Sequence, residues 1–129
     1  MMSATVRVPV RLRGIGLHSR LPVTVELSPA SAGHGIVFNR RTRAVVRHAS
    51  VRMHTTCLGT GPRRVGAVEH LMAACAGLGL TDLDVAVSGG ELPFLDGSSR
   101  PYVRAILRAG VRRSRQRVDP LRLDEPVVM

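Results

Sequence analysis

The sequence predicts an α+β fold in which two helices pack on one face of a single sheet. Two observations support this prediction. Short segments with strand-like alternation occupy the first half of the chain, and two segments with helical spacing follow, separated by one more strand. Runs of strands followed by helices are typical of α+β domains. A chain of 129 residues is long enough for one such domain.

Alternation of apolar and polar residues predicts the strands. Residues 5–12 alternate valine with arginine, and residues 22–27 alternate valine and leucine with threonine and glutamate, as half-buried strands do. The intervening residues 14–19, which contain two glycines, predict a turn. The remaining strand candidates are residues 36–38, 44–46, 51–53, 83–87 and 118–123.

Helical spacing predicts two helices. The first covers residues 67–78 and buries a stripe made of Val68, Leu71, Met72, Cys75 and Leu78.

The second helix is capped by Ser98 or Ser99 and runs to about Ala109, where Gly110 ends it. Its buried residues are predicted to be Val103, Ile106 and Leu107. The segment that follows, residues 112–117, is simply basic.

Composition and charge narrow the function classes. The formal charge is +10, yet every basic residue is arginine, which indicates a GC-rich coding bias as much as a binding surface. Aromatic residues make up only 2% of the chain, which disfavours a platform that stacks nucleic-acid bases. We therefore expect no nucleic-acid partner. An anionic small molecule or an anionic membrane surface is at least as natural a partner for this charge.

The sequence also carries an expectation about the compartment. No apolar run approaches the roughly 20 residues of a membrane helix, the first residues lack the apolar core of a secretory signal, and Cys57 and Cys75 form no disulfide framework. We expect a cytoplasmic protein with no membrane span.

The clearest candidate for chemistry is the pair Glu69 and His70 at the start of the first helix. The pair could be a catalytic carboxylate beside a metal-ligating imidazole. It could equally be an exposed polar edge, with Glu69 favourably placed near the helix N-terminus. One histidine is not a catalytic zinc site, which typically has three protein ligands.

Other candidates are weaker. His18 lies in a glycine-containing turn that could approach a ligand closely, or could face solvent. Cys57 could line a pocket, although a buried reduced cysteine is the commoner case. His34, His48 and His54 have no mutual spacing that indicates a cluster, and residues 96–98 indicate a turn and a helix cap.

Six short motifs occur together in one order: Gly-Ile-Gly-Leu-His-Ser at 14–19, Thr-Cys-Leu at 56–58, Val-Glu-His-Leu-Met-Ala-Ala at 68–74, Gly-Leu-Gly at 77–79, Glu-Leu-Pro-Phe-Leu-Asp-Gly-Ser at 91–98 and Pro-Tyr-Val at 101–103. In this order and spacing, the chain resembles the N-terminal half of the UDP-3-O-acyl-N-acetylglucosamine deacetylases, zinc hydrolases of lipid A synthesis. The resemblance covers about residues 7–124. It implies the first of two similar α+β domains, each a sheet with two packed helices.

The resemblance also implies roles. Glu69 corresponds to the general base that activates the zinc-bound water, and His70 corresponds to a zinc ligand. His18, Thr56, Cys57 and Leu58 correspond to segments near the substrate cleft. The implied substrate is UDP-3-O-acyl-N-acetylglucosamine, which would lose acetate.

The family's second domain supplies further metal ligands that this chain does not show, since no histidine follows His70. We therefore expect residues 1–124 to form the first domain and residues 125–129 to begin a linker to an absent second domain. Zinc would then find one of three expected ligands here, and the chain alone is expected to be inactive unless a separate polypeptide completes the site. A non-catalytic binding or assembly module derived from the family is the alternative.

Overall fold

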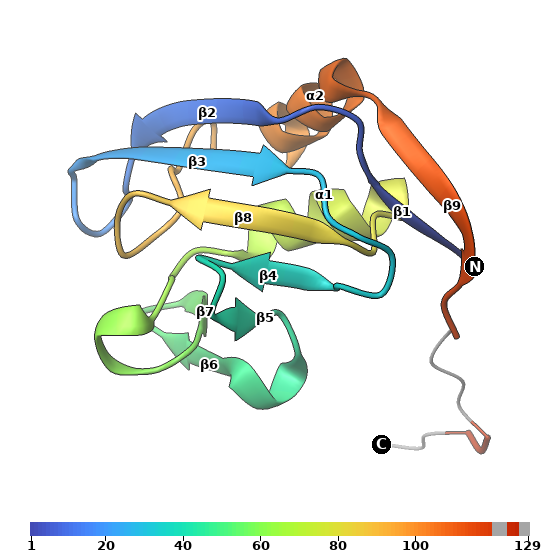
Figure 1. Ribbon diagram of the computed structural model, residues 1–129. Helices are drawn as coiled ribbons and strands as arrows, with labels where there is room; N and C mark the ends of the chain where they lie inside the picture. The colour runs from blue at the N-terminus through green and yellow to red at the C-terminus, as the bar shows by residue number, and fades with distance from the viewer. Residues whose placement is uncertain (120–123, 127–129) are drawn as a thin grey trace.

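The computed structural model describes residues 1–119 and 124–126. Its centre is a five-stranded sheet with the strand order β2-β3-β8-β4-β5. Both helices pack behind this sheet, on the same face (Figure 1). The elements of this layer pair are β2 (Val10–Ile15), β3 (Pro22–Ser28), β4 (Ile36–Phe38), β5 (Thr42–Arg43), β8 (Leu83–Val87), α1 (Glu69–Leu78) and α2 (Arg100–Ala109). The predicted α+β fold is confirmed.

Two small ribbons accompany the main sheet, so the predicted single sheet was too simple. One ribbon pairs β1 (Met2–Val6) with β9 (Val111–Arg117), and the other pairs β6 (Ala49–Arg52) with β7 (Thr55–Leu58). Two short 3-10 turns, η1 (Val46–His48) and η2 (Gly61–Arg63), precede β6 and follow β7. The β6–β7 ribbon projects from the end of the sheet that carries β4 and β5 (Figure 1).

The predicted strand 5–12 is in fact two strands that belong to different sheets. β1 ends at Val6 and pairs with β9, whereas β2 begins at Val10 and pairs with β3. Pro9 lies in the gap, and proline has no N–H to donate to a continuous ladder. The Arg7 N–H instead donates to the Gly110 carbonyl at 2.9 Å, where the chain leaves α2.

The core lies between the main sheet and the helices. β3 and β8 are antiparallel, with Val25 opposite Val87 and Leu27 opposite Val85, and β4 joins β8 in parallel. Leu27, Val85 and Phe38 are fully buried. The alternation read from the sequence therefore placed the inward face of β3 and β8 correctly.

Helix α1 begins two residues later than predicted. Ala67 has a φ of 56°, a left-handed conformation that a right-handed helix cannot include, so the first helical residue is Glu69. Gly79, with a φ of 67°, ends the helix in the left-handed conformation typical of a C-terminal glycine. Leu71 and Cys75 are fully buried, and Met72 and Leu78 pack against the core, which confirms the predicted stripe.

Helix α2 has its predicted limits but a different buried face. Ile106 is buried as expected, whereas Leu107 is 58% exposed, and Tyr102 and Ala105 are buried instead. Residues 102, 105, 106 and 109 have the spacing of one helix face, and Leu107 lies outside it. Of the two predicted caps, Ser99 occupies the N-cap position but makes no side-chain cap hydrogen bond, whereas the hydroxyl of Ser98, one position earlier, accepts the Arg100 N–H at 3.1 Å.

The remaining strand predictions had mixed outcomes. Residues 51–53 fall partly in β6, but residues 44–46 form no strand, because β5 ends at Arg43 and η1 starts at Val46. The basic segment 112–117 is β9, which the sequence analysis missed. Of the predicted strand 118–123, residues 120–123 lie outside the described residues.

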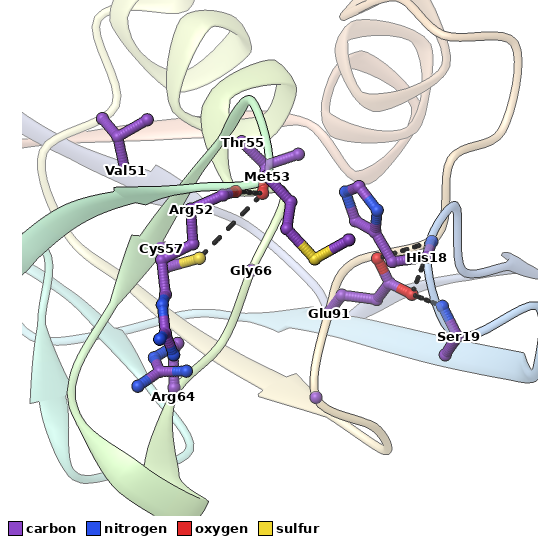
Figure 2. A pocket seen from close by; sticks show the side chains of 11 residues that line it. His18, Ser19, Val51, Arg52, Met53, Thr55, Cys57, Arg64, Gly66 and Glu91 are labelled. Carbon is purple, nitrogen blue, oxygen red and sulfur yellow. Dashed lines mark hydrogen bonds between the residues drawn. The ribbon is translucent and has the colours of Figure 1, made fainter.

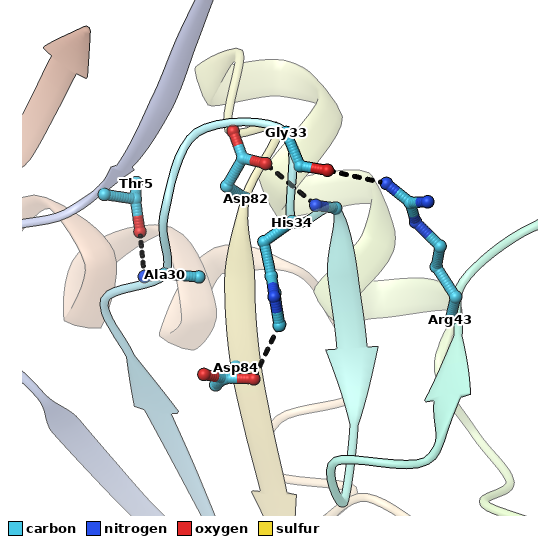
Figure 3. Close-up of polar contacts among 8 residues, drawn as sticks. Thr5, Ala30, Gly33, His34, Arg43, Asp82 and Asp84 are labelled. Carbon is cyan, nitrogen blue, oxygen red and sulfur yellow. Dashed lines mark hydrogen bonds and ion pairs between the residues drawn. The ribbon is translucent and has the colours of Figure 1, made fainter.

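A buried carboxylate ties the start of the chain to the main sheet. Asp82 is 1% exposed and accepts hydrogen bonds from the hydroxyls of Ser3 and Thr81 and from the Gly35 N–H. Figure 3 shows its contact with the loop that leads into β4. Burial alone would raise the pKa of this carboxyl, but the hydrogen bonds from Ser3, Thr81 and the backbone outweigh it and lower the pKa.

We expect Asp82 to make stability depend on acid pH. Its lowered pKa means that the native state holds fewer protons than the unfolded chain. The stabilisation is therefore complete above about pH 4 and is lost as the pH falls through the native pKa. Asp82→Asn should lower the free energy of unfolding by about 1–3 kcal/mol at pH 7. It should also make that free energy depend less on pH between about pH 4 and pH 2. Urea denaturation across that range measures both effects.

Asp84→Asn is the matched control. Asp84 contacts His34 at the surface at 2.9 Å, and such exposed pairs contribute about 0–1 kcal/mol. If Asp82→Asn and Asp84→Asn change the dependence of the free energy of unfolding on acid pH equally, Asp82 does not have the role described.

Candidate functional site

A cavity of about 620 Å³ opens between four segments that are far apart in the sequence. They are the turn from β2 to β3, the β6–β7 hairpin, the segment between η2 and α1, and the loop after β8. Figure 2 shows side chains from these segments facing the cavity from opposite sides, with His18 and Glu91 on one side and Cys57 on the other. We call this cavity the pocket.

The hairpin that forms one wall turns tightly at the pocket mouth. Its two turn residues, Met53 and His54, have φ values of 48° and 61°. Two successive left-handed residues are typical of a two-residue type I′ turn, which favours asparagine or glycine. Larger residues here carry backbone strain, and the side chains of Met53 and Val51 remain exposed.

Glu91 holds the His18 turn against the opposite wall. It is only 6% exposed, and its carboxylate accepts the Ser19 N–H at 2.6 Å and the His18 N–H at 3.1 Å. Gly16 makes this approach possible, because a Cβ at that position would collide with the Glu91 carboxylate. The turn that carries His18 is therefore fixed, while the His18 side chain itself is exposed.

The charge of Glu91 is maintained by these contacts. Burial alone would raise the pKa of the carboxyl, but the hydrogen bonds from Ser19 and His18 lower it below the usual glutamate value. Glu91 therefore remains an anion at neutral pH, with its oxygens directed at backbone N–H groups.

Strand β7 carries the predicted site residues Thr56, Cys57 and Leu58, and each lies in a different environment. Thr55 and Cys57 line the pocket. The backbone of Thr56 faces the start of α1, where its N–H donates to the Glu69 carboxylate at 3.2 Å and its carbonyl accepts the Val68 N–H at 3.3 Å. Leu58 is buried in the hydrophobic core. Their predicted substrate contacts stay predictions.

Glu69 and His70 open helix α1, and both are half-buried. The contact with Thr56 holds the Glu69 carboxylate at the positive end of the helix, a favourable position for an anion. The His70 ring makes no hydrogen bond within residues 1–119 and 124–126, so its nitrogens are available there. Neither residue lines the pocket, but Thr56 connects the pair to the strand that does.

The other histidines are dispersed. His34 bonds to Asp84 at 2.9 Å, and the ring of His48 lies 2.8 Å from the Arg43 carbonyl. Across the described part of the chain, no three histidine, cysteine, aspartate or glutamate side chains gather as a metal site would require. Burial raises the pKa of the Cys75 thiol to about 12, which disfavours the thiolate that a metal needs.

Comparison with known sequences decides the family. The family model described as UDP-3-O-acyl N-acetylglycosamine deacetylase matches residues 3–129. The chain belongs to this deacetylase family. Among relatives named UDP-3-O-acyl-N-acetylglucosamine deacetylase, the protein of Myxococcus xanthus is 47% identical over 108 residues, which are 78% of this chain and 34% of the relative. That of Anaeromyxobacter sp. is 41% identical over 128 residues, which are 95% of this chain and 42% of the relative.

The deacetylase family agrees with the resemblance seen in the motifs. The alignments cover most of this chain but only part of each relative. The chain spans between about a third and two fifths of the length of these relatives. Among the helices in the described residues, none is long and apolar enough to cross a membrane.

Of the residues that line the pocket, sequence reasoning singled out His18 and Cys57 and missed the rest, including the charged residues Arg52, Arg64 and Glu91. Glu91 was noticed as part of a motif, but its partner in the His18 turn lies more than 70 positions earlier. Arg64 lies outside the six motifs, yet it lines the pocket. The one available signal was that Glu91 begins the motif at residues 91–98, whereas Arg64 lies between the motifs at 56–58 and 68–74.

Proposed function

We propose that the chain is the first domain of a zinc-dependent deacetylase of lipid A synthesis, acting in the cytoplasm on the N-acetyl group of UDP-3-O-acyl-N-acetylglucosamine. The family membership supports the reaction class. The observation that carries the proposal is the Glu69 carboxylate, which the Thr56 N–H holds at the start of α1, one position before His70. A positioned carboxylate, followed by an imidazole without a hydrogen-bond partner among the described residues, suits a hydrolase that activates water.

In this proposal Glu69 accepts a proton from the water that attacks the amide carbonyl, as a general base does. Its contact with the Thr56 N–H fixes the carboxylate without consuming both oxygens. His70 is a metal ligand, and its half-buried ring has no competing partner among the described residues. His18, Thr56, Cys57 and Leu58 belong to the segments that bind or support the substrate.

The described residues do not form a complete zinc centre. Catalytic zinc typically takes three protein ligands and an open position. His70 has no second or third candidate ligand gathered around it in residues 1–119 and 124–126. We therefore propose that residues 1–124 are one domain, that residues 125–129 start a linker, and that the further zinc ligands come from the part of the relatives that lies beyond the matched region.

A binding or assembly module without catalysis is the second candidate. The incomplete metal set favours it, because the pocket could bind a ligand with no metal present. The two candidates differ in whether an added partner domain produces turnover.

We expect the purified chain to hold much less than one zinc per molecule and not to deacetylate the nucleotide sugar. Adding the part of the Myxococcus xanthus relative that lies beyond the matched region should restore both zinc binding and turnover, provided that the two surfaces fit. Elemental analysis and acetate release measure these outcomes. In the mixture, His70→Ala should weaken zinc binding.

One tightly bound zinc in the isolated chain would overturn this account of an incomplete site. Zinc binding and turnover that return equally well with His70→Ala would show that His70 is not a ligand. A mixture that binds the nucleotide sugar with no turnover would favour the module.

A further inference from the structure

Two arginines line the pocket on the side opposite the His18 turn. Arg52 comes from the end of β6, and Arg64 comes from the segment between η2 and α1. In Figure 2 both side chains lie on the Cys57 side of the pocket, away from His18, Ser19 and Glu91. The pocket therefore has a cationic side that the predicted roles of Glu69 and His70 do not use.

Arg64 carries a polar atom with no partner. Its Nε is buried and has no hydrogen-bond acceptor within the described part of the chain. Buried polar groups in native proteins are nearly always paired, and an unpaired one is destabilising. Because the atom is closed to solvent, the Arg64 side chain must shift before a ligand can supply an acceptor.

Among the residues that the structure describes, no carboxylate forms an ion pair with Arg52 or Arg64. The ion pairs among the described residues are Arg11 with Glu26 and His34 with Asp84, both outside the pocket. Glu91 is the one carboxylate in the pocket lining that the structure describes, and the backbone N–H groups of His18 and Ser19 bind it on the other side. The positive charge on the arginine side is therefore uncompensated.

The backbone around Arg64 is held on both sides. Its own N–H donates to the Gly61 carbonyl at 3.2 Å and closes η2, while the next residue, Val65, exchanges two hydrogen bonds of 2.9 Å with Leu58 of β7. Arg63, one position earlier, is exposed and does not line the pocket. The sequence thus offers a matched pair of neighbouring arginines, one inside the pocket and one outside.

We propose that Arg64, assisted by Arg52, forms an oxyanion subsite that binds a phosphate group. A guanidinium presents parallel N–H donors that match two phosphate oxygens, and such charge-assisted bonds are stronger than neutral ones. The cavity of about 620 Å³ has room for a ligand larger than a phosphate ion. Assigning this group to the diphosphate of a nucleotide sugar rests on the proposed function, whereas the anion subsite itself does not.

Titration calorimetry of the 129-residue chain with pyrophosphate, uridine diphosphate and uridine tests the proposal. Pyrophosphate and uridine diphosphate should bind, and uridine should bind much more weakly than uridine diphosphate. Arg64→Gln should weaken both phosphate ligands by about 10- to 100-fold, the loss expected for one charge-assisted hydrogen-bonding group. Arg63→Gln, which removes the same charge one position away, should change the affinity less than about twofold, as does an exposed charge screened by salt.

A second variant keeps the test decisive if Arg64→Gln fails to fold. Arg52 is exposed, so Arg52→Gln should fold normally and still weaken the phosphate ligands several-fold. Equal losses for Arg63→Gln and the pocket variants would show only non-specific attraction to a chain of charge +10, and would overturn the proposal. So would the failure of both phosphate ligands to bind.

The outcome is independent of turnover. If both phosphate ligands bind through Arg64 but the complemented protein releases no acetate, the subsite stands and the deacetylase function fails. If acetate is released with unchanged substrate affinity in Arg64→Gln, the function stands and the assignment of the subsite to the diphosphate of the nucleotide sugar fails.

Discussion

Replacing Glu69 by glutamine is expected to lower the turnover of the complemented protein by about 10²- to 10⁴-fold, the usual contribution of a general base. The glutamine side chain has nearly the same shape and can still accept the Thr56 N–H, so the start of α1 should be undisturbed. Zinc content should remain unchanged, because Glu69 is not proposed as a ligand. Initial rates of acetate release, measured beside elemental analysis and thermal unfolding, separate these effects.

Glu26→Gln is a suitable control for Glu69→Gln. Glu26 forms its ion pair with Arg11 on the main sheet and does not line the pocket, so its removal should leave turnover unchanged. If Glu69→Gln keeps full turnover with a normal fold, Glu69 is not the base. If it loses zinc as well as activity, the division of roles between Glu69 and His70 is wrong.

Leu71→Ala is expected to lower the free energy of unfolding by about 2–5 kcal/mol, because truncation of a buried leucine loses transfer free energy and leaves a cavity. Leu71 is 0% exposed and sits in the core cluster between α1 and the main sheet. This loss is a large share of the roughly 5–15 kcal/mol that stabilises a typical domain. Chemical denaturation of the chain measures it directly.

The comparison with Leu107→Ala makes the test specific to burial. Leu107 carries the same side chain on the other helix but is 58% exposed, so its truncation should change stability by no more than about 0.5 kcal/mol. Equal losses for the two variants would contradict the assignment of the buried helix faces.

Sequence periodicity correctly predicted the elements that bury one face against the core, because burial of one face produces a regular apolar pattern. Residues 22–27, 36–38 and 83–87 became β3, β4 and β8, and the stripe around Leu71 became the buried side of α1. In α2 the apolar residues alone were misleading. Ala105 is fully buried although its side chain is small. Leu107 lies outside the buried face that Tyr102 and Ile106 define.

The segments that pattern alone could not place depend on distant partners. β9 is rich in arginine and mostly exposed, and it is a strand because β1 supplies its hydrogen bonds. The prediction joined β1 to β2 because alternation continues across Pro9, although the pairing partner changes there. The positions of the pocket residues Glu91 and Arg64 likewise depend on contacts that form only when the chain folds. Glu91 contacts the His18 turn, and the backbone around Arg64 bonds to η2 and β7.

The β1–β9 ribbon has a consequence for how the chain is made. Met1 and Val118 are hydrogen-bonded at 117 positions apart, so the two strands of this ribbon emerge from the ribosome far apart in time. At about 5–20 residues per second, β1 waits roughly 6 to 23 seconds for its partner. During that interval Ala4 and Val6, which end fully buried, sit on an unpaired strand edge that invites association with other nascent chains. The strand that shelters β1 is thus synthesised long after it, and translation speed bears directly on the yield of folded protein.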